Sequence, residues 1–159
     1  MRFFPLLILC LILVASPLFR GALAQEPVVL RLEQAVDFSR PGHQARFCAH
    51  IANDAPSRTI GLMFQKHLPE QGGMFFDFQT VEIVQMWMRN TILPLDMVFI
   101  GPDARIVKIV RNTTPFSLAI ISSDVPARSV LEINAGAADR HDLKIGDLVR
   151  LVDTKCTLP

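Results

Sequence analysis

The chain has 159 residues, of which 50% are hydrophobic and 19% are charged. Its 16 lysines and arginines nearly balance its 15 acidic residues, and the basic residues form no cluster. A chain with this charge distribution has no electrostatic footprint for nucleic acid or for an anionic membrane surface.

Residues 1–24 have the pattern of a secretory signal, with a basic residue, an apolar run and a small-residue ending, Ala-Leu-Ala, at 22–24. A retained transmembrane anchor is the rival interpretation. It is less favoured because Pro5 and Pro17 interrupt an apolar run that is shorter than the roughly 20 residues a membrane span needs. We therefore expect a mature chain that begins at Gln25, is periplasmic or secreted, and has no membrane attachment after cleavage.

The mature part, residues 25–159, suits a single domain that buries roughly two thirds of its unfolded surface. Cleavage removes two arginines and no acidic residue, which leaves 14 basic and 15 acidic residues and a formal charge of −1. Two cysteines remain, Cys48 and Cys156, and outside the cytosol a thiol pair tends to oxidise. We predict a disulfide between them, with two separate thiols as the alternative.

Residues 28–52 are expected to form a β-hairpin. β-branched and apolar residues at 28–36 are followed by turn-forming residues at 39–42, and apolar side chains then alternate with polar ones over 43–52.

A short amphipathic helix is expected over about 56–67. Asp54 is a suitable N-cap, Pro56 fits the first turn, and apolar residues then recur at helical spacing from 60 to 68.

The remainder alternates between short apolar segments and turns rich in Gly, Pro, Asn and Asp. Strands are expected at 74–78, 81–88, 97–100, 105–111, 117–121, 129–133 and 148–152, with a second small helix at 135–143. Eight or so short strands with two short helices predict a mainly β (α+β) domain, built as a small, strongly curved sheet or partial barrel.

Several blocks of this sequence, in this order, resemble the "domain of unknown function 192" family. The blocks are Gly61-Leu62-Met63, Gly73-Met74-Phe75-Phe76, Trp87-Met88-Arg89-Asn90-Thr91, Leu93-Pro94-Leu95-Asp96, Val98-Phe99, Pro126-Ala127, Val130-Leu131-Glu132, Ala135-Gly136 and Gly146-Asp147. Ser57 and Gln65 depart from the family pattern, which usually has an acidic and a basic residue there. The resemblance implies a compact, mostly β domain, often exported in bacteria, with no agreed biochemical activity.

The stretch 85–100 concentrates unusual residues, and Asp96 lies within it between apolar neighbours. An isolated carboxylate is expensive to bury unless it is hydrogen-bonded or paired with a cation, for which Arg89 and Arg58 are candidates. Asp96 could act as an acid or base of raised pKa in a cleft. We favour a structural role, as a buried acceptor for the amides of the turn 89–91.

Glu132, on an apolar strand, allows the same two interpretations. If Glu132 and Asp96 faced one cleft at a separation of roughly 5 to 10 Å, a carboxylate-based hydrolase acting on extracellular glycan would be possible. The sequence contains no nucleophile elbow, phosphate-binding glycine loop or Cys-His pair to indicate another catalytic class.

Aromatic and sulfur-containing side chains offer two further hypotheses. Trp87, together with Phe64, Phe75, Phe76 and Phe99, could line the floor of a ligand-binding groove, although such residues more often form the core. The mature chain is rich in Met, a soft ligand suited to Cu(I), so a copper-binding protein is a further alternative if sulfurs converge at the surface. The histidines are scattered and show no zinc-site spacing.

These observations favour a non-catalytic binding or accessory module, with no catalytic residue, metal or cofactor assigned. Its ligand would be an unknown small molecule or an envelope protein, because a few polar groups among apolar strands are typical of a binding wall. The candidate ligand-binding residues are Arg58, Arg89, Asn90, Thr91, Asp96 and Glu132.

Overall fold

The structure is a computed structural model, and it describes residues 26–156, the side chains of residues 153 and 154 excepted. The expected signal segment, residues 1–24, lies outside the described residues. The described part contains nine strands and two short helices. The elements are β1 (Gln34–Arg40), β2 (His43–Ala52), α1 (Ala55–Ile60), β3 (Gly72–Glu82), β4 (Gln85–Met86), β5 (Leu95–Ile100), β6 (Ile106–Val110), β7 (Ile121–Ser122), β8 (Ala127–Asn134), α2 (Ala137–Arg140) and β9 (Leu148–Lys155).

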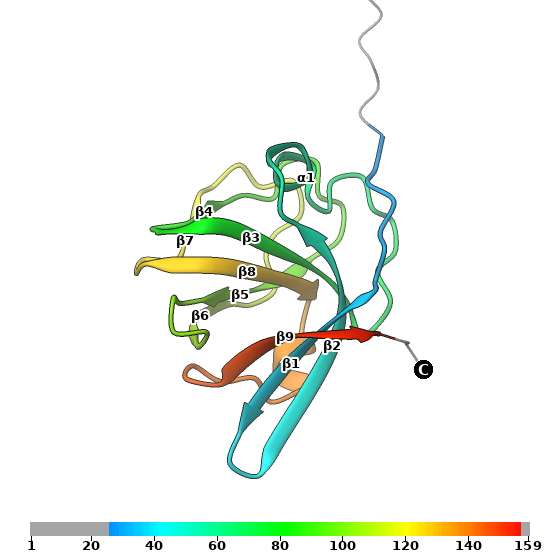
Figure 1. Cartoon of the computed structure of the whole chain (residues 1–159). Helices are drawn as coiled ribbons and strands as arrows, with labels where there is room; N and C mark the ends of the chain where they lie inside the picture. The colour runs from blue at the N-terminus through cyan, green and yellow to red at the C-terminus, as the bar shows by residue number, and fades with distance from the viewer. Residues whose placement is uncertain (1–25, 157–159) are drawn as a thin grey trace, which may run out of the picture.

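Seven of the strands form one sheet in the order β6-β5-β8-β3-β2-β1-β9, and all neighbours are antiparallel except the parallel pair β2 and β3. The sheet curls into a half-barrel, with the β1–β2 hairpin projecting from one end (Figure 1). An isolated bridge between Arg105 and Leu148 links the two sides of the curl next to β6 and β9. The structure therefore confirms the predicted mainly β fold with a strongly curved sheet.

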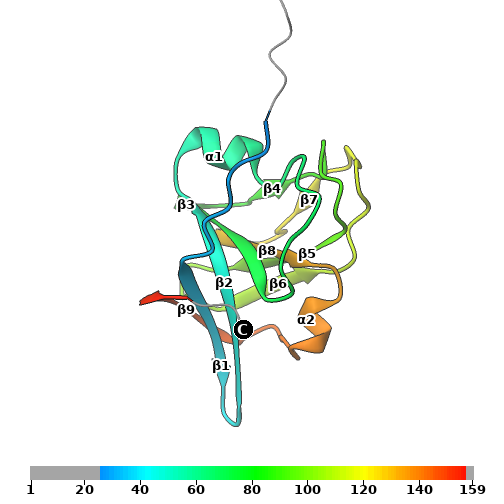
Figure 2. The same cartoon turned by 90° about the vertical axis from the view of Figure 1, so that its right-hand side faces the viewer.

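The sheet separates two apolar cores. The first, which we call the inner core, takes residues from both outermost strands, including Ile106 and Val149, so the curl of the sheet encloses it together with α2. The second, the outer core, lies on the other face and packs against the loops around α1, β4 and β7 (Figure 2). Alternation along β8 supplies both cores, with Leu131 facing the inner core and Val130 the outer core.

The predicted N-terminal hairpin is present, but its first strand begins later than expected. β1 starts at Gln34, and the turn is limited to Pro41 and Gly42, whose φ of 75° suits glycine. The preceding segment lies alongside β2, where the Arg31 N–H donates to Nδ1 of His50 at 3.1 Å.

Helix α1 is shorter than the predicted range 56–67. Asp54 caps it as expected and accepts the Ser57 N–H at 2.7 Å. The helix ends at Ile60 because Gly61 and Phe64 both adopt positive φ, which is incompatible with a continuing right-handed helix.

Two strands differ from the prediction: of 81–88, residues 81 and 82 end β3 and residues 85 and 86 form β4, and of 117–121 only residue 121 is in a strand, β7. β4 and β7 pair only with each other, outside the main sheet. The second predicted helix, 135–143, is also shorter, since α2 covers only Ala137–Arg140.

A disulfide joins Cys48 in β2 to Cys156 after β9, across 108 residues and with a Cα–Cα distance of 5.6 Å. The structure thus contains the predicted cysteine pair. Chain entropy gives such a loop closure a stabilisation of about 5 kcal/mol. Within residues 26–156, no helix has the length and apolar character needed to cross a membrane.

Candidate functional site

Asp96 is a fully buried carboxylate that ties three parts of the fold together. Its Oδ1 accepts the Asn112 N–H and its Oδ2 accepts the Ala138 N–H, both at 2.9 Å. The second amide lies in the first turn of α2, where amides have no partner within the helix. The structural interpretation of Asp96 is therefore supported, but the expected partner amides were wrong, because none belongs to the turn 89–91.

Glu132 is also buried, at 4% exposure, but its environment is different. It lies between Met74 of β3 and Met97 of β5, which are its partners in register on the outer-core face. No described residue donates a hydrogen bond to its carboxyl group or forms an ion pair with it. Burial raises the pKa of Glu132 to about 8, so the group is largely protonated at neutral pH.

The two carboxyl groups do not share a cleft. Asp96 is in register with Ile133, which belongs to the inner core, whereas Glu132 is in register with Met97, which belongs to the outer core. Residues directly opposite each other in an antiparallel pair point to the same face, so Asp96 and Glu132 point to opposite faces of the sheet. The arrangement required for the carboxylate hydrolase is absent.

Arg58 lies in the last turn of α1 and does not approach Asp96. Its Nη1 donates to the Asp77 backbone carbonyl at 3.0 Å, and its guanidinium lies 5.9 Å from the centroid of the Phe78 ring. Arg58 therefore fastens α1 to β3.

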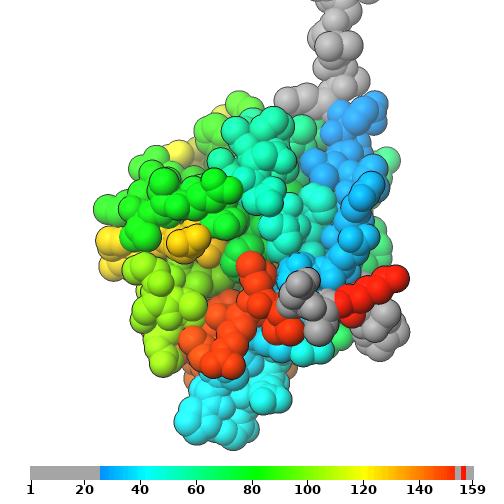
Figure 3. Space-filling model, viewed as in Figure 1, coloured from blue at the N-terminus to red at the C-terminus, as the bar shows by residue number. Residues whose placement is uncertain are grey.

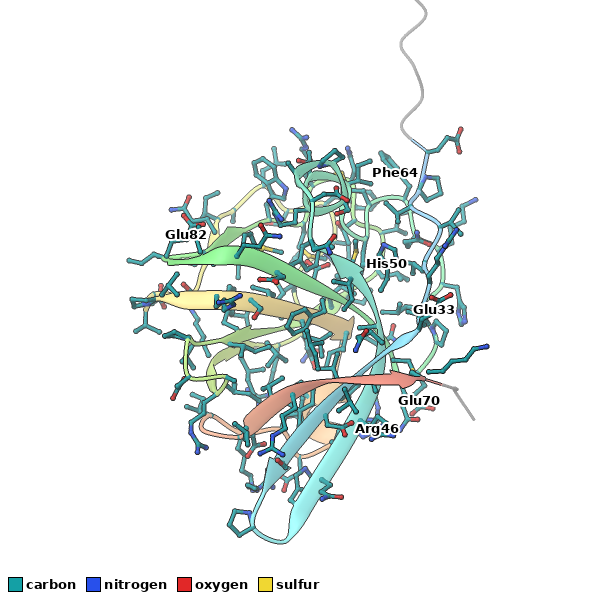
Figure 4. All side chains as sticks on the ribbon, in the orientation of Figure 1. Glu33, Arg46, His50, Phe64, Glu70 and Glu82 are labelled. Carbon is teal, nitrogen blue, oxygen red and sulfur yellow. A yellow bond between two sulfur atoms is a disulfide. The ribbon has the colours of Figure 1, made fainter. Side chains whose placement is uncertain are left out.

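The turn 89–91 is the meeting point of three loops. The Asn90 carbonyl accepts the Phe64 N–H at 2.9 Å, and the Thr91 carbonyl accepts the Phe116 N–H at 3.1 Å. Figure 4 labels Phe64 in the loop after α1. Phe64, Asn90 and Phe116 all have a positive φ, between 56° and 63°, which is unusual for phenylalanine. Backbone strain of this kind tends to gather where a fold presents a functional surface.

The methionines of this region do not form a surface sulfur site. Met74, Met88 and Met97 are fully buried, and Met63 is 4% exposed. Nor do His, Cys, Asp and Glu form any group of three suited to a metal ion within residues 26–156. Met86 is half-buried, so in the described part of the chain it is the one methionine with a side chain near the surface, and no two methionine sulfurs meet there.

Residues 37–151 match the family model DUF192, which is described as an uncharacterised ACR. The chain belongs to the DUF192 family. A crystal structure of a candidate transcription regulator from Sinorhizobium meliloti 1021 is 37% identical, with a TM-score of 0.73, and the match covers 79% of this chain and 98% of that one. A protein of unknown function from Novosphingobium aromaticivorans DSM 12444 is 31% identical, with a TM-score of 0.71, and the match covers 80% and 94% of the two chains. No curated protein matches this chain significantly.

In this DUF192 domain the loops joined at the turn 89–91 expose several large apolar side chains and one arginine. We call these residues the loop surface: Ile83, Trp87, Arg89, Ile92, Phe116, Leu118 and Ile120. Leu118 is 68% exposed and Phe116 is 60% exposed. The Arg89 guanidinium lies 4.8 Å from the centroid of the Trp87 ring, a cation–π contact.

The pairing of β4 with β7 explains why these side chains point outward. Met86 and Ile121 are in register and pack on the outer core, so their neighbours Trp87 and Ile120 point away from it. The loops carrying them lie side by side in Figure 2, and Glu82, labelled in Figure 4, marks the end of β3 where the loop surface begins.

Arg89, a candidate ligand-binding residue from the sequence, is exposed on these loops, whereas the apolar side chains of the later loop were not among the candidates. Leu118 and Ile120 lie within the strand predicted at 117–121, of which the structure keeps only residue 121, in β7. Trp87 is exposed, whereas Phe75, Phe76 and Phe99, considered with it as a groove floor, lie in the core.

Proposed function

We propose that this protein is an exported, non-catalytic binding module that uses the loop surface to bind another protein of the cell envelope. The observation that carries this proposal is the number of large apolar side chains exposed on neighbouring loops that also carry the Trp87–Arg89 contact. Contiguous exposed apolar patches on a monomer mark interaction sites more often than chance.

The composition of the loop surface favours a protein partner. Tryptophan and arginine are enriched among residues that dominate protein–protein binding energy. Arg89 forms no ion pair with any described residue, so its charge is available. A partner that fits would present an apolar patch with a carboxylate opposite Arg89.

The buried carboxyl groups support a non-catalytic role. Asp96 is committed to two backbone amides, and Glu132 is on the other face of the sheet. Asn90 and Thr91 use their carbonyls to hold the loops together, which makes them supports of the loop surface.

Export is supported by the signal-like pattern of residues 1–24 and by the cysteine pair joined in the fold. The intact mass of the protein recovered from the cell envelope tests it. A chain beginning at Gln25 is expected, and a chain that retains residue 1 would contradict cleavage.

A role in transcription regulation, as in the description of the Sinorhizobium relative, is not proposed for this protein, because the near-neutral charge favours no nucleic-acid surface.

Site-specific photocross-linking in living cells tests the binding surface. A photoreactive amino acid introduced in place of Leu118 reports on the loop surface. The same photoreactive amino acid in place of Gln44 is the control, because Gln44 is exposed on the β1–β2 hairpin at the far end of the molecule (Figure 2). We expect one discrete adduct from position 118 that is absent from position 44 and is lost in an Arg89→Glu background. Equal adducts from both positions, or no adduct from position 118, would overturn the proposal.

A further inference from the structure

A second concave region lies on a different side of the molecule from the loop surface. It is a pocket of about 300 Å³ between β9 and the strands β3, β8 and β5, and none of its lining residues belongs to the loop surface. Figure 3 shows this side, where the orange-red atoms of β9 meet the green atoms of β3. The residues that matter most here are Phe75, Asp77, Arg128, Ser129, Val149 and Leu151.

The pocket is an opening into the half-barrel. Leu151 is in register with Val36, an inner-core residue, so it points to the concave face. It nevertheless remains 46% exposed, whereas Val149, two residues earlier on the same face, is 5% exposed. The inner core is therefore open to solvent at Leu151, at the kind of barrel mouth where small ligands commonly bind.

A break in the sheet sits at this opening. The β3–β8 pairing runs to Asp77 opposite Ser129, and it resumes only at Glu82 opposite Ala127. Breaks of this kind in strand pairing change the direction of the neighbouring side chains, and they are often found next to binding sites. Ser129 is 6% exposed, and its hydroxyl, which has no hydrogen-bond partner among the described residues, is not a fully enclosed atom and so keeps access to the pocket.

Opposite charges flank the Ser129 hydroxyl. The Nε of Arg128 lies 3.8 Å from Oδ1 of Asp77, which also accepts the Gln79 N–H at 2.9 Å. The guanidinium of Arg128 donates no hydrogen bond to a described residue, and its side chain is 52% exposed. Both charged groups therefore keep hydrogen-bonding capacity for a ligand.

We propose that this pocket binds a small zwitterion with an apolar side chain, such as an apolar α-amino acid. Arg128 receives the carboxylate, Asp77 receives the ammonium, and the Ser129 hydroxyl donates to the carboxylate. The apolar side chain lies against Phe75, Val149 and Leu151. This inference is independent of the loop surface, because the two sites share no residue.

Titration of the ¹⁵N-labelled protein with L-leucine, followed by ¹H–¹⁵N spectra, tests the pocket. The probes are L-leucine and N-acetyl-leucine, which lacks the ammonium. The variants are Arg128→Gln and Asp77→Asn, and Lys66→Gln, an exposed charge outside the pocket, is the matched control. The dispersion of each spectrum shows whether the variant is folded.

L-leucine is expected to shift the amide signals of Ser129 and Leu151 in a saturable way. Each pocket variant should weaken the binding of L-leucine about tenfold or more, because one charge-assisted contact is lost, and N-acetylation of the probe should have the same effect. Lys66→Gln should leave the affinity for L-leucine unchanged. No shift of pocket amides at millimolar L-leucine would overturn the proposal. Equal binding of N-acetyl-leucine, or unchanged binding by Arg128→Gln, would overturn the assignment of a zwitterion.

Discussion

Asp96 and Glu132 lie on adjacent strands, in successive register positions, and their carboxyl groups point to opposite faces of one sheet. The Asp96 carboxylate is fully hydrogen-bonded to backbone amides, whereas the Glu132 carboxyl group has no partner among the described residues. Two acidic residues that look equivalent in the sequence therefore have different physical roles. Asp96 organises the backbone, and we expect Glu132 to make the stability of the fold sensitive to pH.

Replacing Asp96 with alanine should destabilise the protein by about 3 kcal/mol or more, because two buried amides lose a charged acceptor. Asp96→Asn, which keeps the size and one acceptor oxygen, should cost less. Chemical denaturation measures both losses, and hydrogen exchange should quicken at the amides of Asn112 and Ala138. A variant that loses cross-linking at position 118 with unchanged stability and exchange would contradict a purely structural role.

Glu132 should make the free energy of unfolding fall as the pH rises. Its pKa is about 8 in the folded protein and ordinarily 4.5, so between these values the unfolded chain releases a proton that the folded chain retains. The contribution is fully present below the ordinary pKa and is lost as the pH rises through the folded pKa, at up to about 1.4 kcal/mol per pH unit. Glu132→Gln should remove this dependence, so its stability relative to the wild type should increase from about pH 5 to about pH 8.

Denaturant titrations of wild type and Glu132→Gln across this range give the difference directly. Glu33→Gln, a change at an exposed glutamate labelled in Figure 4, controls for a general effect of charge removal. Parallel pH profiles of the wild type and Glu132→Gln would show that Glu132 titrates normally in the fold.

The overall fold could be predicted because local patterns and tertiary structure agree along most strands. Alternation over 43–52 and the apolar segment within 95–100 needed no long-range information to identify strands. The predicted length of α1 was wrong because contacts with distant parts of the chain determine where this helix ends. Phe64 is held in a left-handed conformation by the Asn90 carbonyl, 26 positions further along the chain, and local helical spacing contains no signal for such a contact.

The candidate site could be predicted only in part for the same reason. Asp96 was identified as a buried acceptor from its apolar neighbours, but its donors lie 16 and 42 positions away. The apolar residues of the later loop looked like a strand. They are exposed because β7 finds only the short β4 as a partner, which depends on how the loops pack and cannot be inferred from the segment itself.

Removing the disulfide should lower the free energy of unfolding by about 5 kcal/mol, as expected for release of a long loop. The paired substitutions Cys48→Ser and Cys156→Ser in one chain avoid leaving a single thiol. Denaturation of this variant and of the wild type, with and without reductant, measures the effect. The wild type should become as unstable as the variant when reduced, and a wild type insensitive to reductant would show that the bond does not constrain the chain in solution.

The central claim is that the loop surface binds a protein partner through apolar contacts and the charge of Arg89. The most direct measurement is the yield of the cross-linked adduct from position 118 in cells carrying Arg89→Glu, compared with Lys155→Glu, the same charge reversal at an exposed residue of β9. We predict that Arg89→Glu reduces the adduct about tenfold or more, as reversal of an interfacial charge does, while Lys155→Glu leaves it unchanged and both proteins keep the wild-type melting temperature. An adduct that persists at wild-type yield in folded Arg89→Glu would contradict the claim.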